Sequence, residues 1–243
     1  MKTMIIAHRG ASRSAPENTM PAFELAYEMG AQAIETDVHL TKDQVPVLIH
    51  DETVKRTTNG KGSVKDLTFK ELETLDAGSW FDPSFSGARI LSLDAFLQWA
   101  KDKPLHLNIE LKNNKIDYPR LEEIAYEHVA HCQLLHRTIF STFNPDSVKR
   151  LNRYKGEVEI AYLTSRERHL LKKAAELNVD ALHIKYSQLK PGLAAACHDQ
   201  GLALRIYTVN RPSRLVRCFK ENCDAVITDV PRDALQCLQQ FST

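Results

Sequence analysis

Acidic side chains recur at a fixed spacing in two short β-rich runs. Glu35 and Asp37 stand two residues apart in the run 33–40, and Glu110 lies near the end of the run 105–112. Residues two apart on a strand project to one face, so these carboxylates converge if both runs end at the same rim. Converging carboxylates repel unless a cation lies between them, and oxygen ligands suit Mg²⁺ or Ca²⁺ better than zinc. The pattern predicts one divalent cation held by these three residues; solvated carboxylates at a strand end are the alternative.

Two histidines occur beside a charged residue at the ends of β-rich runs, as His8-Arg9 and His50-Asp51. A hairpin centred near Asp43 would return His50 to the rim that carries the carboxylates. Imidazole titrates near neutrality, so two histidines beside one site suit the roles of general base and general acid. We therefore predict that His8 and His50 are the catalytic pair and interpret the remaining histidines as structural.

Positive charge is predicted at the same rim. Arg9 follows His8 directly, and Lys112 stands two residues after Glu110. Arginine offers forked donors and lysine a point charge, so the pair suits a negatively charged substrate group, with phosphate the best fit. The alternative for Lys112 is a buried ion pair with Glu110 that only satisfies both groups.

Strand-like runs alternate with segments of helical periodicity along the whole chain, which is typical of βαβ units and a parallel sheet. The runs 33–40 and 44–51 are separated by only a few residues, too few for a parallel connection, so they must form an antiparallel hairpin. Eight βα units then remain in 243 residues. This count favours a closed (β/α)8 barrel, a TIM barrel, over an open doubly wound sheet, and barrel active sites lie at the C-terminal ends of the strands.

Residues 52–88 interrupt the alternation. The segment is rich in Gly, Ser, Thr and Pro, carries a short helical stretch, and is too long for a plain loop. We interpret it as a small insertion at the C-terminal mouth of a single barrel domain spanning 1–243.

Composition narrows the class of protein. Lys and Arg number 32 and Asp and Glu 31, so the formal net charge is +1 and nothing favours nucleic-acid binding. No run approaches the roughly 20 apolar residues of a membrane span, the N-terminus does not resemble a signal peptide, and there is no amphipathic membrane anchor with a basic face. The five Cys include no C-x-x-C pair. We expect a cytoplasmic protein without stable membrane anchoring, and the sequence carries no signal for its oligomeric state.

The ordered motifs resemble those of the glycerophosphodiester phosphodiesterase family. They read AHRGAS, APENTMPAF, GAQAIETDVHLTKDQVPVLIHDETVKRTTNGKG, LTFKELETLDAGSWF and LNIELK, then FSTFN, YTVN and DAVITDVP. Together they cover essentially the whole chain. Two positions depart from the family pattern: Gln44 replaces part of an acidic-glycine turn at the hairpin tip, and Tyr207 stands where the family often carries Trp.

The resemblance implies a TIM barrel that uses a divalent metal to hydrolyse small glycerophosphodiesters, such as glycerophosphocholine or glycerophosphoethanolamine. The products would be sn-glycerol 3-phosphate and an alcohol. Trp80 and Phe81, in the insertion, and Tyr207 are possible substrate-lining residues, although the aromatic pair is equally suited to pack the insertion onto the barrel. Residue by residue, the resemblance matches His8 and His50 to the catalytic histidines, Glu35, Asp37 and Glu110 to the metal ligands, Arg9 to a phosphate-contacting arginine and Lys112 to a supporting cation.

Several alternatives stay open at the level of sequence. His8 as base and His50 as acid is the preferred assignment, but the spacing does not decide it. The attacking oxygen could belong to water, or to the substrate's own hydroxyl through a cyclic phosphate. A lysophospholipase D-type activity on lipid diesters and a non-catalytic phosphodiester-binding barrel are the rival functions; a complete acid–base pair argues against the second, because a binding protein needs none.

Overall fold

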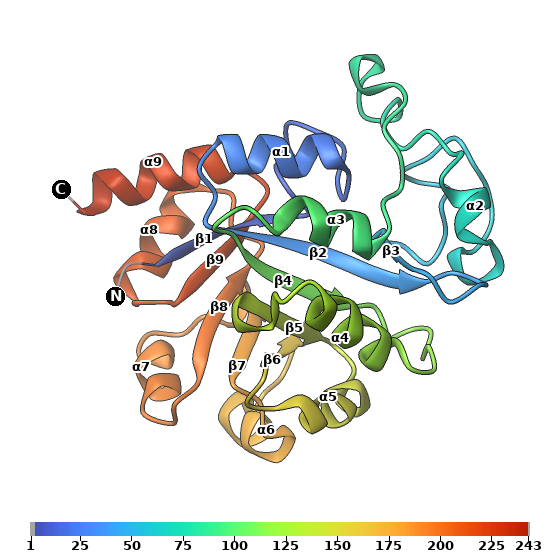
Figure 1. Ribbon diagram of the computed structural model, residues 1–243. Coiled ribbons are helices and arrows are strands. Elements are labelled where there is room, and N and C mark those ends of the chain that lie inside the picture. Colours follow the sequence, from blue (N-terminus) through green and yellow to red (C-terminus); the bar gives the residue numbers. More distant parts are fainter. Residues whose placement is uncertain (1–2, 243) are drawn as a thin grey trace.

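The computed structural model describes residues 3–242, which form a closed barrel of eight parallel strands surrounded by helices (Figure 1). The strands follow the order β1-β9-β8-β7-β6-β5-β4-β2, and pairing of β1 with β2 closes the ring. The prediction of a (β/α)8 barrel is confirmed. The barrel strands are β1 (Met4–His8), β2 (Ala33–Leu40), β4 (His106–Leu111), β5 (Thr138–Thr142), β6 (Glu159–Thr164), β7 (Ala181–Lys185), β8 (Ala203–Tyr207) and β9 (Ala225–Thr228).

Helices connect the strands and cover the outside of the barrel. Among the described residues, none of these helices is both long and apolar enough to cross a lipid bilayer. The α-helices are α1 (Met20–Glu28), α2 (Phe69–Leu72), α3 (Leu93–Ala100), α4 (Leu121–His131), α5 (Pro145–Leu151), α6 (Leu170–Leu177), α7 (Leu193–His198), α8 (Pro212–Lys220) and α9 (Pro231–Ser242). Single-turn 3-10 helices are η1 (Val64–Asp66), η2 (Pro83–Phe85), η3 (Leu135–Arg137), η4 (Asn152–Tyr154) and η5 (Tyr186–Gln188).

Side-chain alternation on β4 explains how the barrel presents polar groups. Leu107 and Ile109 are completely buried in the large apolar cluster that also contains side chains of α3 and α4. Asn108 and Glu110 alternate with them and so point to the barrel interior. A parallel strand buried on both faces normally reads as continuously apolar, so the polar inward residues mark the strand that carries the site.

The predicted antiparallel hairpin joins β2 to β3 (Pro46–Leu48), with Val38 opposite Leu48. Continuing this register places His50 opposite Thr36, close to the end of the barrel. The tip residue Gln44 has φ +61°, the left-handed region that glycine occupies most easily. The departure from the usual acidic-glycine turn therefore leaves a strained residue at the tip without changing the hairpin.

Between β3 and α3 the chain forms η1, α2 and η2, and Figure 1 shows this part at the end toward which β2 points. A capping box starts α2: the Thr68 hydroxyl accepts from the Glu71 backbone N–H, and the Glu71 carboxylate accepts from the Thr68 backbone N–H. A second, small apolar cluster holds the segment against the hairpin. Its buried members are Val47, Ile49, Val54, Val64, Leu72, Ala77 and Ile90.

Candidate active site

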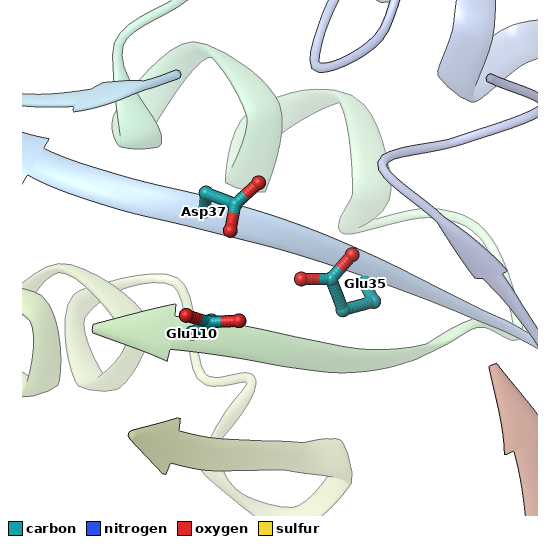
Figure 2. A group of neighbouring side chains, drawn as sticks. All are labelled: Glu35, Asp37 and Glu110. Carbon is teal, nitrogen blue, oxygen red and sulfur yellow. The ribbon is translucent and has the colours of Figure 1, made fainter. Parts of the chain in front are cut away.

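Three carboxylates converge inside the C-terminal end of the barrel. Glu35, Asp37 and Glu110 offer oxygen atoms that all lie within 4.8 Å of one another. Figure 2 shows the first two on β2 and the third on the neighbouring strand β4, with the carboxyl groups turned toward a common space. The parallel register that pairs Asp37 with Glu110 produces this arrangement, because inward residues of adjacent strands lie side by side. The structure brings the three predicted ligands together.

Burial makes this cluster electrostatically unusual. All three residues are buried, and Asp37 is completely inaccessible. Burial and the charges of Asp37 and Glu110 raise the pKa of Glu35 well above its ordinary value. Burial alone would also raise the pKa of Asp37, but the positive charges of Arg9 and Lys112 hold that pKa well below its usual range. Positive charge thus keeps Asp37 ionised, whereas burial and the neighbouring carboxylates favour the protonated form of Glu35.

The donor set fits a hard divalent cation. Asp37 Oδ1 is buried and accepts no hydrogen bond within residues 3–242, which leaves a carboxylate oxygen available for coordination. Its other oxygen accepts a hydrogen bond from Asn18 Nδ2 at 2.9 Å, which fixes the carboxylate plane. Three converging oxygen ligands, one of them oriented by a hydrogen bond, are typical of Mg²⁺ or Ca²⁺ sites rather than zinc sites.

Arg9 and Lys112 lie directly against the carboxylates. Arg9 Nε is 3.0 Å from Asp37 Oδ2, and Lys112 Nζ is 2.7 Å from Glu110 Oε1 and 3.4 Å from Asp37 Oδ1. Burial lowers the pKa of each cation, but the facing carboxylates outweigh it and raise both pKa values. Both side chains therefore stay charged at the rim, as the sequence predicted.

Each of the two rim histidines is held by a carboxylate. His8 Nδ1 lies 2.6 Å from Asp229 Oδ1, and His50 Nδ1 lies 2.7 Å from Asp51 Oδ1. A carboxylate accepts, so Nδ1 must donate in both pairs, and Nε2 of the neutral ring is left with a lone pair. His8 Nε2 is 4.0 Å from Glu35 Oε2, which places it beside the carboxylate cluster.

An ion-pair network behind the histidines was not predicted. Arg56 donates to both oxygens of Asp51 and also to the carboxylate of Glu17, and Glu17 accepts a further hydrogen bond from Arg9 Nη1 at 2.9 Å. Arg56 and Glu17 belong to the RTT and PENT parts of the sequence motifs, and Asp229 belongs to DAVITDVP. The motifs therefore contain all three residues, but a motif alone does not show which side chains pair.

A cavity of about 160 Å³ opens between these groups. Tyr207 and Phe143 form part of its wall, with ring centroids 6.0 Å apart and the rings edge to face. The Tyr207 hydroxyl is buried and has no hydrogen-bond partner in the described part of the chain. The full lining comprises His8, Arg9, Glu35, His50, Asn108, Glu110, Lys112, Phe143, Leu163, Tyr207, Thr208 and Ile227.

Trp80 and Phe81 are not among these lining residues. They stack edge to face on each other, with centroids 5.7 Å apart, and Phe81 makes the same contact with Phe85. The Trp80 indole donates to Ala77 O, and the residue is 39% exposed. The pair packs within its own segment, so the structure does not bring it to the cavity.

Fold and site together define a class: a TIM barrel whose mouth combines a carboxylate cluster, two cations and two carboxylate-held histidines. The comparison with known families agrees. Residues 8–233 match the model of the glycerophosphoryl diester phosphodiesterase family, and the chain belongs to that family. It is therefore a phosphoric diester hydrolase by family.

Relatives and solved structures resemble the chain over nearly its whole length. The glycerophosphodiester phosphodiesterase of Caldanaerobacter subterraneus subsp. tengcongensis is 38% identical, with 99% of each chain covered. A glycerophosphodiester phosphodiesterase structure from Agrobacterium tumefaciens is 32% identical with a TM-score of 0.82, covering 95% of this chain and 97% of that one. An Oleispira antarctica phosphodiesterase in complex with the product sn-glycerol-3-phosphate is 28% identical with a TM-score of 0.87, covering 98% and 97%.

Proposed function

We propose that the protein hydrolyses small glycerophosphodiesters to sn-glycerol 3-phosphate and an alcohol, with a divalent cation and two histidines. The observation that carries this proposal is the placement of His8 and His50 in one cavity with Glu35 and Glu110, whose carboxylates form a cluster with the buried Asp37. Acid, base and metal ligands then lie around a single space. The product bound to the Oleispira antarctica relative is the product expected here.

Glu35, Asp37 and Glu110 would hold one Mg²⁺ or Ca²⁺ ion, since Asp37 Oδ1, which accepts no hydrogen bond within residues 3–242, and the oxygen-only ligand set fit such an ion. When bound, the ion acts as a Lewis acid that stabilises negative charge on the transferring phosphoryl group. Arg9 and Lys112 add fixed positive charge beside it, so the phosphate is held by donors that need no reorganisation during the reaction.

The histidines move the protons. In our assignment, the lone pair of His8 Nε2 takes the proton from the attacking oxygen, which belongs to water or to a substrate hydroxyl. A new P–O bond forms while the P–O bond to the alcohol breaks, and His50, in its protonated form, gives its Nε2 proton to the departing oxygen. Asp229 and Asp51 stabilise the imidazolium form of each ring through the Nδ1 hydrogen bonds.

Four apolar or aromatic residues, with Asn108 and Thr208, form the remaining wall of the cavity: Phe143, Leu163, Tyr207 and Ile227. We assign Tyr207 and Phe143 to contact with the organic part of the substrate, because both aromatic rings line the cavity and contact each other there. The unpartnered Tyr207 hydroxyl would then hydrogen-bond a substrate oxygen, a contact that a tryptophan at this position would make with different geometry.

The test measures release of sn-glycerol 3-phosphate from glycerophosphocholine with Mg²⁺, with Ca²⁺ and with chelator. Metal-dependent release is expected, and His8→Ala and His50→Ala should each lower kcat by roughly 10²-fold or more. His198→Ala is the matched control, because His198 also pairs with an aspartate but lies outside the cavity. Loss below tenfold in both variants would reject the histidine roles, and no release with either metal from folded protein would reject the substrate class.

A further inference from the structure

A second concave feature lies at the C-terminal end of the barrel, between the segment that follows β6 and the segment that follows β7. We call it the basic groove; its volume is about 580 Å³, larger than that of the site cavity. Its lining residues come from both segments and from the first turns of α6 and α7. They are Arg166, Glu167, Arg168, His169, Leu170, Leu171, Lys172, Ser187, Gln188, Lys190 and Leu193.

Charge is concentrated in this groove. Arg166, Arg168, Lys172 and Lys190 supply four permanent positive charges, and Glu167 is the single carboxylate in the lining. The whole chain carries a formal net charge of only +1, so the distribution is uneven. A local excess of one sign in a concave surface raises the concentration of oppositely charged ligand groups.

These four cations are also uncommitted. None of them is within ion-pair distance of a carboxylate in residues 3–242, and all four are exposed. The arginines of the active-site rim differ in this respect, because Arg9 and Arg56 are both held in ion pairs. The groove thus gathers four cationic side chains whose donors remain available to a ligand.

The backbone adds to the same electrostatic field. The eight-residue helix α6 starts inside the groove, and its first three residues all contribute to the lining. The N-cap residue His169 makes no side-chain cap hydrogen bond, and the first turn of the helix contains no acidic residue. The positive end of the helix dipole therefore faces the groove, and it is partly offset by Glu167, whose carboxylate accepts a hydrogen bond from the His169 backbone N–H at 2.9 Å.

The groove begins where the wall of the site cavity ends. Leu163 of β6 lines the site cavity, and Arg166 follows it by three residues, which limits the separation of their Cα atoms to about 11 Å. On the other side, Lys185 at the end of β7 pairs in register with the cavity residue Tyr207, and Ser187 of the groove follows two residues later. A substrate whose phosphate lies at Arg9 and Lys112 can thus extend its alcohol part toward the groove.

We propose that the basic groove binds a second anionic group, a phosphate or carboxylate, on the alcohol part of the substrate. The enzyme then prefers diesters of acidic alcohols to those of choline, whose positive charge the groove repels. This inference rests on the proposed function and deepens it, because it assigns the class of the leaving alcohol. Arg166, Arg168 and Lys190 are the specificity-determining residues in this assignment.

The test compares kcat/KM for glycerophosphoinositol 4-phosphate and for glycerophosphocholine, at fixed ionic strength with the preferred metal. The wild-type ratio should favour the first substrate. An exposed ion pair changes a binding constant by roughly 1.5- to fivefold, so the triple variant Arg166→Gln, Arg168→Gln, Lys190→Gln should lower the ratio by about tenfold. The control Lys101→Gln, Arg153→Gln, Lys220→Gln removes the same charge from exposed residues outside the groove and should leave the ratio unchanged.

Each other outcome has a definite meaning. A ratio that is the same in the wild type and both triple variants overturns the groove assignment while leaving the proposed function intact. Inorganic phosphate could instead activate glycerophosphocholine hydrolysis in the wild type and not in the groove variant. That result would assign the groove to a free anion and overturn its role in substrate choice. If neither diester is hydrolysed, the proposed function fails. Calorimetric titration with inositol 4-phosphate then tests the groove separately. Binding to the wild type and not to the groove variant would support the groove assignment, and equal binding to both would overturn it.

Discussion

Replacing Asp229 by Asn tests whether the carboxylate behind His8 contributes to catalysis. The substitution keeps the shape of the side chain and removes its charge. Asp229 Oδ1 lies 2.6 Å from His8 Nδ1, and the same carboxylate accepts hydrogen bonds from Ser12 Oγ at 3.2 Å and Asn210 Nδ2 at 2.5 Å. The side chain is therefore held in place from three directions, and its main electrostatic effect falls on the imidazole.

The magnitude follows from the geometry. When His8 accepts a proton, a full positive charge forms about 4 Å from the centre of the carboxylate, an interaction worth about 4 kcal/mol at an effective dielectric constant near 20. The Asp229 and His8 side chains are 28% and 19% exposed, so solvent screens roughly half of it, which leaves about 2 kcal/mol. Since 1.36 kcal/mol is a factor of ten, Asp229→Asn should lower kcat by about 30-fold with little change in KM.

The assay is steady-state release of sn-glycerol 3-phosphate by the single variants Asp229→Asn and His8→Ala and by their double variant. If Asp229 acts through His8, the double variant should be no slower than His8→Ala alone. Asp224→Asn is the matched control, since Asp224 accepts from His198 at 2.8 Å outside the cavity. A loss below threefold for Asp229→Asn, or losses that multiply in the double variant, would refute the reasoning.

Three further predictions concern metal binding, acid stability and turn strain. Asp37→Asn should weaken Ca²⁺ or Mg²⁺ binding at least tenfold by calorimetry, independently of activity, whereas the exposed Asp94→Asn should not. Burial, with the charge of Arg205, lowers the pKa of His183 well below 6.5. As the pH falls below 6.5, the unfolded chain therefore binds a proton at His183 that the folded chain does not bind, and the free energy of unfolding decreases. Urea unfolding of His183→Gln should therefore show about 2 kcal/mol less loss of stability than the wild type between pH 7 and pH 5. Gln44→Gly should leave stability equal or raise it by up to about 1 kcal/mol, because glycine relieves the left-handed backbone; marked destabilisation would contradict this.

Local periodicity was enough to predict much of the fold and the carboxylate cluster. The alternation on β4 depends only on neighbouring residues, so Glu110 could be placed on the inner face without knowledge of the rest of the chain. The short link around Asp43 likewise forced an antiparallel hairpin and brought His50 back to the rim. These inferences needed strand geometry alone.

Other parts of the site depend on contacts that no local pattern encodes. The partner of His8 is 221 residues away along the chain and is placed only when β9 pairs with β1. The basic groove forms between two loops whose conformations are set by packing, so the sequence did not place Lys190 beside Arg166 and Arg168. For Trp80 and Phe81 the sequence left substrate lining and packing of the insertion equally open, because their packing is decided inside their own segment. The reading of residues 52–88 as an inserted unit and the cytoplasmic location stay predictions.

The contact between His8 and Asp229 has a consequence for how the protein is made. A ribosome adds about 5–20 residues per second, so β9 is synthesised roughly 10–45 s after β1. Until then the nascent chain contains the three carboxylates of β2 and β4, but it has neither a closed ring nor the carboxylate that orients His8. Catalytic competence is thus tied to the last strand, and its appearance during translation would report the moment at which the barrel closes.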